Sequence, residues 1–278
     1  MKKLYTLLLL LIANVSLVMA QNHIVEGFLI KRDLNNANVE LYYPVVKGNG
    51  ADKINAQIMQ VYNEINPVKR TVEPVDGETL ELMVDQSIEF AAEIGLKKSI
   101  DELPYTHFGS WRYTESDVMI SIIIAQFIDM GNPVPRIKLS AININKSTGE
   151  IFNIHDLINN PQHISDLAAE QFCRDHKLPA NALRLITGLN YELSSLPLAK
   201  TIGITKKGLT MFYERGEIAP TNMPPIIISI PFSAIDDNVY SDGVEDNEIS
   251  VKQGVKKVRK LVYSYLKEQR KVGKHKKH

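Results

Sequence analysis

The 278-residue sequence has little cysteine, little tryptophan and no excess of charge. Cys173 and Trp111 are the only residues of their kinds, and 32 basic side chains balance 32 acidic ones. A single cysteine excludes an intramolecular disulfide, so the fold has to be held by its core, which a chain of this length can supply. With 15 glycines, 13 prolines and 44% hydrophobic residues, the composition also excludes collagen-like, low-complexity and largely disordered chains.

Common catalytic signatures are also lacking. The sequence contains no HExxH, no GxSxG and no SxxK placed between a predicted strand and helix. We therefore expect no catalytic residues, no cofactor and no enzymatic activity. Glu214 and Glu217 leave one alternative open, a peptidoglycan-directed hydrolase, because glycosidases use two carboxylates several Å apart.

A metal site is not expected either. Cys173, Asp175 and His176 lie within one helical turn, where a thiolate and an imidazole can share a metal ion. No second pair of ligands follows at a suitable spacing. We therefore predict that Cys173 is a buried small hydrophobe and that His176 caps the end of a helix.

The one long apolar run is at the start of the chain. Residues 1–20 begin with Lys2 and Lys3, continue with an apolar stretch over 4–17 and end on Ala20, the pattern of a secretory signal peptide. The stretch is shorter than the ~20 residues of a bilayer span, which favours cleavage near Ala20. The residue after Ala20 is Gln21 and not the cysteine that is acylated in a bacterial lipoprotein. We expect an extracytoplasmic protein, periplasmic or secreted.

Neutral composition conceals an uneven distribution of charge. Residues 251–278 carry eleven basic side chains and one acidic one, whereas residues 21–250 carry 19 basic and 31 acidic ones. A C-terminal amphipathic helix is predicted by apolar residues at spacings of 4, 3, 4 and 3, namely Val251, Val255, Val258, Val262 and Tyr265. Segment 241–278 is thus expected to be a basic helix and tail.

The basic helix offers candidates for contact with an anionic envelope surface: Lys256, Lys257, Arg259 and Lys260. Coulomb attraction to lipopolysaccharide phosphates or anionic lipid is the functional interpretation. A solvated helix end, or docking on the acidic body of the same chain, are the alternatives, and nucleic acid is not the expected partner.

Periodicity predicts a mixture of strands and helices. Strands are expected at 25–31, 39–46, 108–114, 117–128, 136–145, 150–154, 200–205, 209–214 and 226–231. Helices are expected at 53–66 with Asp52 as N-cap, at 79–96, 156–160 and 161–176, and near 181–186. Residues 146–149 are expected to form a turn in which Gly149 is available for a positive φ, and Pro44 suits an edge strand or a bulge.

Aromatic and acidic residues on these strands are candidates for ligand binding. Trp111 and Tyr113 alternate on one predicted strand, as a sugar-stacking platform requires, with packing in the core as the alternative. Tyr213, Glu214 and Glu217, where the second hairpin ends, are further candidates.

Several local motifs follow one another in a fixed order over residues 25–236. They are Tyr43-Pro44 followed by a glycine and Ile54-Asn55-Ala56-Gln57-Ile58, then residues 143–150 leading into Asp156-Leu157-Ile158, then residues 204–210, 217–220 and 230–233. In this order, region 21–240 resembles the extracytoplasmic domain shared by the lysozyme-sensing anti-sigma factor RsiV and the non-catalytic part of the peptidoglycan deacetylase PdaC. Two stretches depart from that pattern, at 131–135 and 221–224.

The resemblance implies an α+β fold in which helices pack on an antiparallel sheet, with no assigned catalytic residues. It also implies a non-catalytic binding module at the cell envelope whose partner is a lysozyme-like cationic protein or an envelope glycan such as peptidoglycan. The alternative from another class is an envelope tethering protein that uses the basic C-terminal helix.

Overall fold

The computed structural model describes residues 23–66, 74–95, 105–116, 118–131, 135–179, 196–221, 224–235 and 245–247. The expected signal peptide over 1–20, the helical stretch near 181–186 and the basic segment from residue 251 lie outside these ranges. The same is true of Lys256, Lys257, Arg259 and Lys260, whose role stays a prediction.

The larger sheet collects the strands of the first half of the chain. Its order is β1-β2-β3-β4-β5-β6, and β10 pairs with the end of β3. The bounds are β1 (Ile24–Leu34), β2 (Ala37–Lys47), β3 (Tyr105–Glu115), β4 (Met119–Asp129), β5 (Arg136–Asn145), β6 (Ile151–Phe152) and β10 (Glu245–Asn247). The almost continuously apolar β4 lies between β3 and β5, as the sequence predicts for a well-covered strand. The binding region was expected to end at residue 240, but β10, which lies after that residue, is still a strand of the larger sheet.

The expected α+β class is confirmed, but the larger sheet is mixed where an antiparallel sheet was expected. β2 runs parallel to β3 where residues 37–41 pair with residues 105–109, while the other neighbouring pairs are antiparallel. Parallel neighbours need a long crossover connection. Here that connection contains α2 (Ala51–Glu64) and α3 (Gly77–Gly95).

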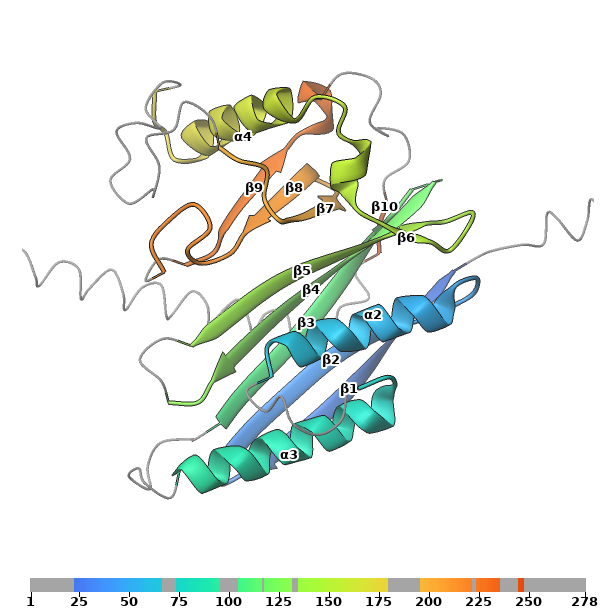
Figure 1. Cartoon of the computed structure of the whole chain (residues 1–278), viewed down its shortest axis with the longest axis vertical. Coiled ribbons are helices and arrows are strands. Elements are labelled where there is room, and N and C mark those ends of the chain that lie inside the picture. Colours follow the sequence, from blue (N-terminus) through green and yellow to red (C-terminus); the bar gives the residue numbers. More distant parts are fainter. Residues whose placement is uncertain are drawn as a thin grey trace, which may run out of the picture.

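Helices α2 and α3 cover one face of the larger sheet (Figure 1). Their apolar stripes enter one hydrophobic cluster with β1 to β5, to which α2 contributes Ile54, Ile58 and Tyr62 and α3 contributes Leu80 and Val84. The Tyr62 hydroxyl donates a 2.7 Å hydrogen bond to the Tyr42 carbonyl, which satisfies the polar atom of a fully buried side chain.

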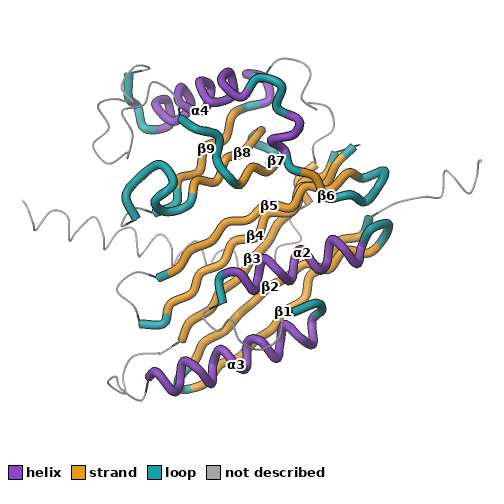
Figure 2. Tube along the Cα trace, viewed as in Figure 1, coloured by secondary structure: helices purple, strands orange, loops and turns teal. Residues whose placement is uncertain are grey.

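A second, smaller sheet has its own core. It is antiparallel, in the order β7 (Thr201–Thr205), β8 (Gly208–Tyr213) and β9 (Ile226–Ile230), and α4 (Pro161–Asp175) packs against β9 (Figure 2). Short 3-10 helices lie at η1 (Ile154–Leu157) and η3 (Phe232–Ala234). Because β7 contacts β4 and β5, the two sheets form one α+β structure.

The start of α2 differs from the sequence prediction. Gly50 is the N-cap with a left-handed φ of 69°, and Asp52 lies inside the first turn, so the prediction of Asp52 as the cap is wrong. The turn before the helix needs a positive φ at Gly50, which glycine adopts without a steric penalty. Within the described ranges, none of the helices has the length and hydropathy that a membrane span requires.

Candidate functional site

The aromatic candidates on β3 lie inside the fold. Trp111 is 3% exposed and Tyr113 is 8% exposed, and their rings stack on each other at 6.2 Å between centroids. Both belong to the cluster that α2 and α3 cover. A Cβ atom at Gly27 would lie 3.1 Å from the Trp111 ring, so β1 closes directly over the indole. In this arrangement neither ring presents a face to a sugar.

Tyr213 is a buried residue of the smaller sheet. Its hydroxyl donates a 2.7 Å hydrogen bond to the Pro197 carbonyl and also contacts the Met211 sulfur at 3.1 Å. Burial raises the pKa of Tyr213, and the nearby charge of Glu217 raises it further. The side chain therefore stays neutral and holds β8 to the segment that leads into β7.

Glu214 and Glu217 lie close together but have different surroundings. Both carboxylate oxygens of Glu217 accept backbone N–H groups, from Lys200 at 2.8 Å and from Glu214 at 2.9 Å. The Glu214 carboxylate is partly exposed and lies 3.7 Å from the Lys138 ammonium group. Glu217 thus acts as a clamp between the turn after β8 and the start of β7.

The predictions for the end of α4 are confirmed. Cys173 is buried, and His176 is the C-cap residue, whose Nδ1 atom lies 2.9 Å from the Phe172 carbonyl oxygen. The His176 ring also stacks on Phe172 at 4.2 Å. Among the residues that the structure describes, no group of three His, Cys, Asp or Glu side chains is placed to hold a metal ion.

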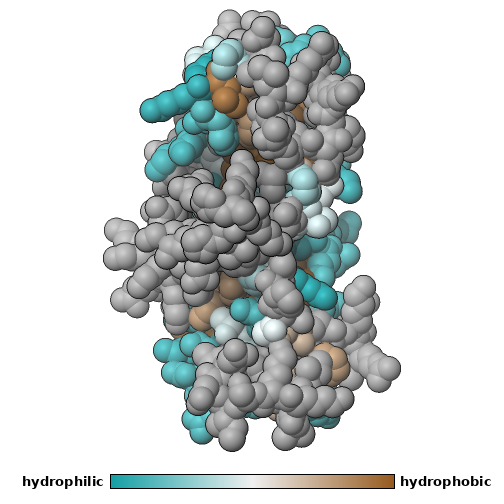
Figure 3. All heavy atoms as spheres, turned by 90° about the vertical axis from the view of Figure 1, so that its left-hand side faces the viewer, coloured by the Kyte–Doolittle hydropathy of each residue, from teal (hydrophilic) through white to brown (hydrophobic). Residues whose placement is uncertain are grey.

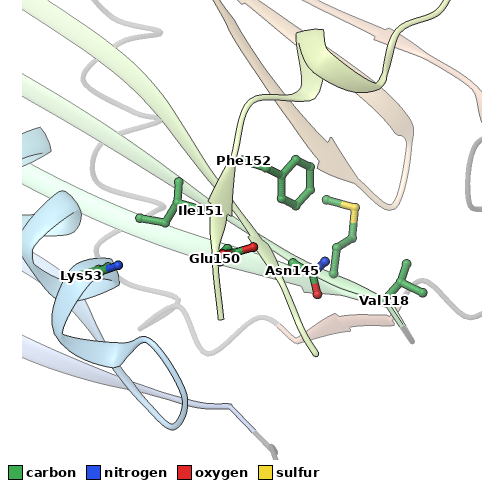
Figure 4. Close-up of a pocket in the computed structure, with 7 residues that line it drawn as sticks. Lys53, Val118, Asn145, Glu150, Ile151 and Phe152 are labelled. Atoms are coloured by element: carbon green, nitrogen blue, oxygen red, sulfur yellow. The ribbon is translucent and has the colours of Figure 1, made fainter. Parts of the chain in front are cut away.

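A surface pocket of about 510 Å³ lies where the β5–β6 hairpin meets the β3–β4 turn and the start of α2. Figure 4 shows Lys53 of α2 at one end and Val118 at the other, with Asn145, Glu150 and Phe152 between them. The lining residues are Lys53, Val118, Met119, Asn145, Glu150, Ile151 and Phe152.

The β5–β6 turn fixes the polar side of the pocket. The Asn145 Oδ1 atom accepts hydrogen bonds from the backbone N–H groups of Ser147 and Thr148, at 2.9 and 3.2 Å. This closes an Asx-type turn, in which Gly149 has the positive φ of 73° that the sequence predicts. Because Oδ1 is occupied, the amide nitrogen is the group that Asn145 offers to the pocket. The Thr148 hydroxyl holds one carboxylate oxygen of Glu150 at 3.3 Å.

Two glycine turns pack together and bring Lys53 to the hairpin. A Cβ at Gly50 would lie 2.4 Å from the Gly149 carbonyl oxygen, and one at Gly149 would lie 2.2 Å from that of Asn49, so only glycine fits at either position. The Asn49 amide donates a 2.7 Å hydrogen bond to the Thr148 carbonyl across the same contact. The first turn of α2 is thereby held against the hairpin, which places Lys53 and Glu150 on one rim.

The pocket combines an apolar wall with a rim of mixed charge. Val118, Met119, Ile151 and Phe152 supply the wall, and Asn145, Lys53 and Glu150 supply a hydrogen-bond donor, a cation and an anion. An apolar lining with a few polar groups is typical of sites for small ligands. These residues can bind and orient an amphipathic molecule; they include no nucleophile paired with a base.

Sequence reasoning missed this pocket as a site. The hairpin turn over 146–149 was predicted, but it indicated only a change of chain direction. The contact of Gly149 with Gly50, about 100 positions earlier in the chain, has no local sequence signal.

The outer face of α3 is strongly acidic. The helix contains five carboxylates and no lysine or arginine: Glu78, Glu81, Asp85, Glu89 and Glu93. Arg32 of β1 neutralises part of this charge through ion pairs with Glu81 at 3.0 Å and Asp85 at 2.8 Å. In the view of Figure 3, the described surface shows small brown apolar patches as well as teal hydrophilic areas.

Comparison with known proteins supports the fold class. No family model and no curated protein matches the sequence. The structure is similar to that of a DUF3298 family protein from Pseudomonas aeruginosa PAO1, with a TM-score of 0.53 and 13% identity, over 78% of this chain and 94% of that chain. It is equally similar to a DUF3298 family member from Bacteroides fragilis NCTC 9343, with a TM-score of 0.54 and 14% identity, over 78% and 94%.

These likenesses show a shared fold. Proteins of the DUF3298 family are related to the RsiV/PdaC-type domain, which the sequence motifs resemble.

Proposed function

We propose that this protein is a non-catalytic binding module of the cell envelope, of the RsiV/PdaC type, acting outside the cytoplasm after its signal peptide is removed. The observation that carries the proposal is the pocket beside the β5–β6 hairpin, with its apolar wall and its rim of one cation, one anion and one amide. The use of Glu217 as a backbone clamp also favours binding over hydrolysis.

The pocket chemistry suits a peptidoglycan fragment. Phe152 and Ile151 can pack against the C–H face of a sugar ring or an acetyl methyl group, since such groups are apolar. Asn145 can donate to a carbonyl oxygen. Lys53 and Glu150 complement the carboxylate and amino groups of a short stem peptide, which carries charges of both signs.

Calorimetric titration of the protein with a disaccharide–tripeptide fragment of peptidoglycan tests this proposal. The charge-reversed variants Lys53→Glu and Glu150→Lys are expected to weaken binding by about tenfold or more, about 1.4 kcal/mol. Matched controls are Arg136→Glu, at the opposite end of β5, and Glu170→Lys, on α4; both residues are exposed. Unchanged affinity in the pocket variants would place the ligand elsewhere.

The same titration, followed by tryptophan emission, separates the pocket from the aromatic pair on β3. Trp111 is the only tryptophan and is buried under Gly27. Binding in the pocket should leave its emission unchanged, whereas stacking of a sugar on Trp111 would shift it. If no peptidoglycan fragment gives a heat of binding or a change in tryptophan emission, the glycan is removed from the proposal.

A cationic protein such as a lysozyme is the second candidate partner, favoured by the acidic face of α3. Attraction between opposite charges raises association rates, and this attraction weakens as salt screens the charges. We expect lysozyme binding to fall steeply between low and moderate salt, and to weaken in Glu78→Lys and Glu89→Lys, which leave the Arg32 ion pairs intact. Binding that is insensitive to salt would contradict an electrostatic interface.

A further inference from the structure

β1 is a long and regular strand at the edge of the larger sheet. It pairs with β2 over all eleven residues without a bulge, and among the described residues no strand pairs with its other side. The opposite edge of the sheet differs, because β6 has only two residues. Natural proteins usually shorten, bulge or cover such edges, since unpaired N–H and C=O groups recruit other strands.

The side chains of β1 are unusually apolar for an edge that faces water. Ile24, Phe28, Leu29 and Leu34 are 54%, 44%, 45% and 49% exposed. Phe28 keeps this exposure although its ring stacks on Tyr43 at 5.7 Å. Apolar side chains therefore reach the surface on both faces of the strand, because neighbouring positions alternate between the faces.

We propose that a second copy of this chain pairs with β1, antiparallel, about a two-fold axis at Leu29. The sequence of β1, IVEGFLIKRDL, is self-complementary in this register. Ile24 lies opposite Leu34, Phe28 opposite Ile30, and Leu29 opposite its own copy. A two-fold interface requires such matching, since each residue meets its counterpart twice.

Charge selects this register over its neighbours. Glu26 lies opposite Arg32 of the second copy, and both side chains are partly exposed. A shift that centres the axis on Phe28 would place Arg32 against Ile24 and Glu26 against Ile30. This shift removes the opposite-charge pair and sets three charges against apolar residues, because Lys31 also meets Val25, whereas the proposed register sets one, Asp33 against Val25. Cross-strand pairing disfavours such mismatches.

The pairing joins two copies of the larger sheet into one continuous sheet and removes the exposed edge. It is independent of the pocket, whose residues come from α2 and from the β3–β4 and β5–β6 turns. Failure of one proposal therefore leaves the other untouched.

Cysteine cross-linking tests the axis. In an antiparallel sheet, opposed Cα atoms are about 4.5–5.5 Å apart, within the range of roughly 4.4–6.8 Å that a disulfide spans. Leu29→Cys should form a disulfide-linked dimer on mild oxidation. The native Cys173 is buried and should give little background. Leu34→Cys is the matched control, because two copies of residue 34 would lie about 33 Å apart.

Light scattering after size exclusion supplies the second readout. We expect the unmodified protein to elute as a dimer and Leu29→Lys as a folded monomer with unchanged circular dichroism. Ile227→Lys, at a similarly exposed position on β9, should remain a dimer. A monomeric native protein at all concentrations, or a dimer that persists in Leu29→Lys without a Leu29→Cys cross-link, would overturn the proposal.

Discussion

The Ser121 hydroxyl on β4 donates a 2.7 Å hydrogen bond to the Asn143 Oδ1 atom on β5, and both side chains are buried between the two sheets. Each residue also bonds to the backbone of β7. The Ile204 N–H donates to the Ser121 Oγ atom at 2.9 Å, and the Asn143 amide donates to the Ile202 carbonyl at 3.0 Å. This pair therefore joins the smaller sheet to the larger one.

Removing Asn143 should weaken the whole fold. In Asn143→Ala the Ser121 hydroxyl and the Ile202 carbonyl both lose a partner in a buried environment, which costs about 1–3 kcal/mol for each unsatisfied group. Urea unfolding should show a loss of about 2–6 kcal/mol.

A double-mutant cycle with Ser121→Ala provides the control for the Asn143 variant. The two losses should be less than additive, because the second substitution removes a group that the first has already left unpaired. Additive losses would mean that the two side chains act independently.

A second prediction concerns His107, which is fully buried in a polar network between β3, β4 and α2. The Gln126 amide nitrogen donates to the Val61 carbonyl at 2.9 Å, so its oxygen faces His107 Nε2 at 3.3 Å. Nε2 then carries the proton, and Nδ1 accepts from the Tyr105 hydroxyl at 3.0 Å. Burial lowers the pKa of His107 from 6.5 to about 4, because the site favours the neutral ring.

The stability of the protein should depend on pH through this residue. The unfolded chain binds the His107 proton below about pH 6.5 and the folded chain only near pH 4, so stability is full above pH 6.5 and falls as the pH drops towards 4. The full shift corresponds to about 3 kcal/mol. Urea midpoints at several pH values should show a flatter dependence in His107→Asn, whereas the exposed control His163→Asn should follow the native protein.

The third prediction concerns the contact between Gly27 and Trp111. A Cβ at Gly27 lies 3.1 Å from the indole, which is closer than an ordinary contact, and a branched side chain would displace the ring. Gly27→Val should therefore cost about 1–3 kcal/mol and shift the tryptophan emission, with a smaller effect in Gly27→Ala. Equal stability of all three proteins would contradict this packing.

The sequence predicts the elements better than their arrangement. The apolar run over 119–128 correctly indicates a central strand, and Gly149 has the positive φ that its turn requires. Pro44 suggests an edge strand or a bulge, but β2 lies between β1 and β3 and pairs with β1 without a bulge. The pairing of β2 with β3 ends at Leu41, so the missing N–H of Pro44 breaks no pair with β3. Patterns within one segment report burial and turns because both depend on nearby residues.

The sequence pattern could not predict which distant segments pair with each other. The parallel contact of β2 with β3 joins residues more than 60 positions apart, and the contact of Gly50 with Gly149 joins two unrelated turns. The burial of Trp111 follows from the passage of β1 over it. Alternation along β3 predicts which residues share a face but not whether that face is covered.

The last prediction separates the two acidic candidates after β8. Glu217 accepts two backbone N–H groups, so Glu217→Ala leaves those of Lys200 and Glu214 without their acceptor and should cost about 2–3 kcal/mol, since hydrogen bonds to charged groups contribute more than neutral ones. Glu214→Ala removes only a partly exposed pair with Lys138 and should change the unfolding free energy by less than about 1 kcal/mol. Thermal and urea unfolding of the two variants measure this difference directly. A larger loss of stability in Glu214→Ala than in Glu217→Ala would show that the clamp is wrongly assigned. If the native protein hydrolyses peptidoglycan and a folded Glu217→Gln variant does not, the hydrolase returns to consideration.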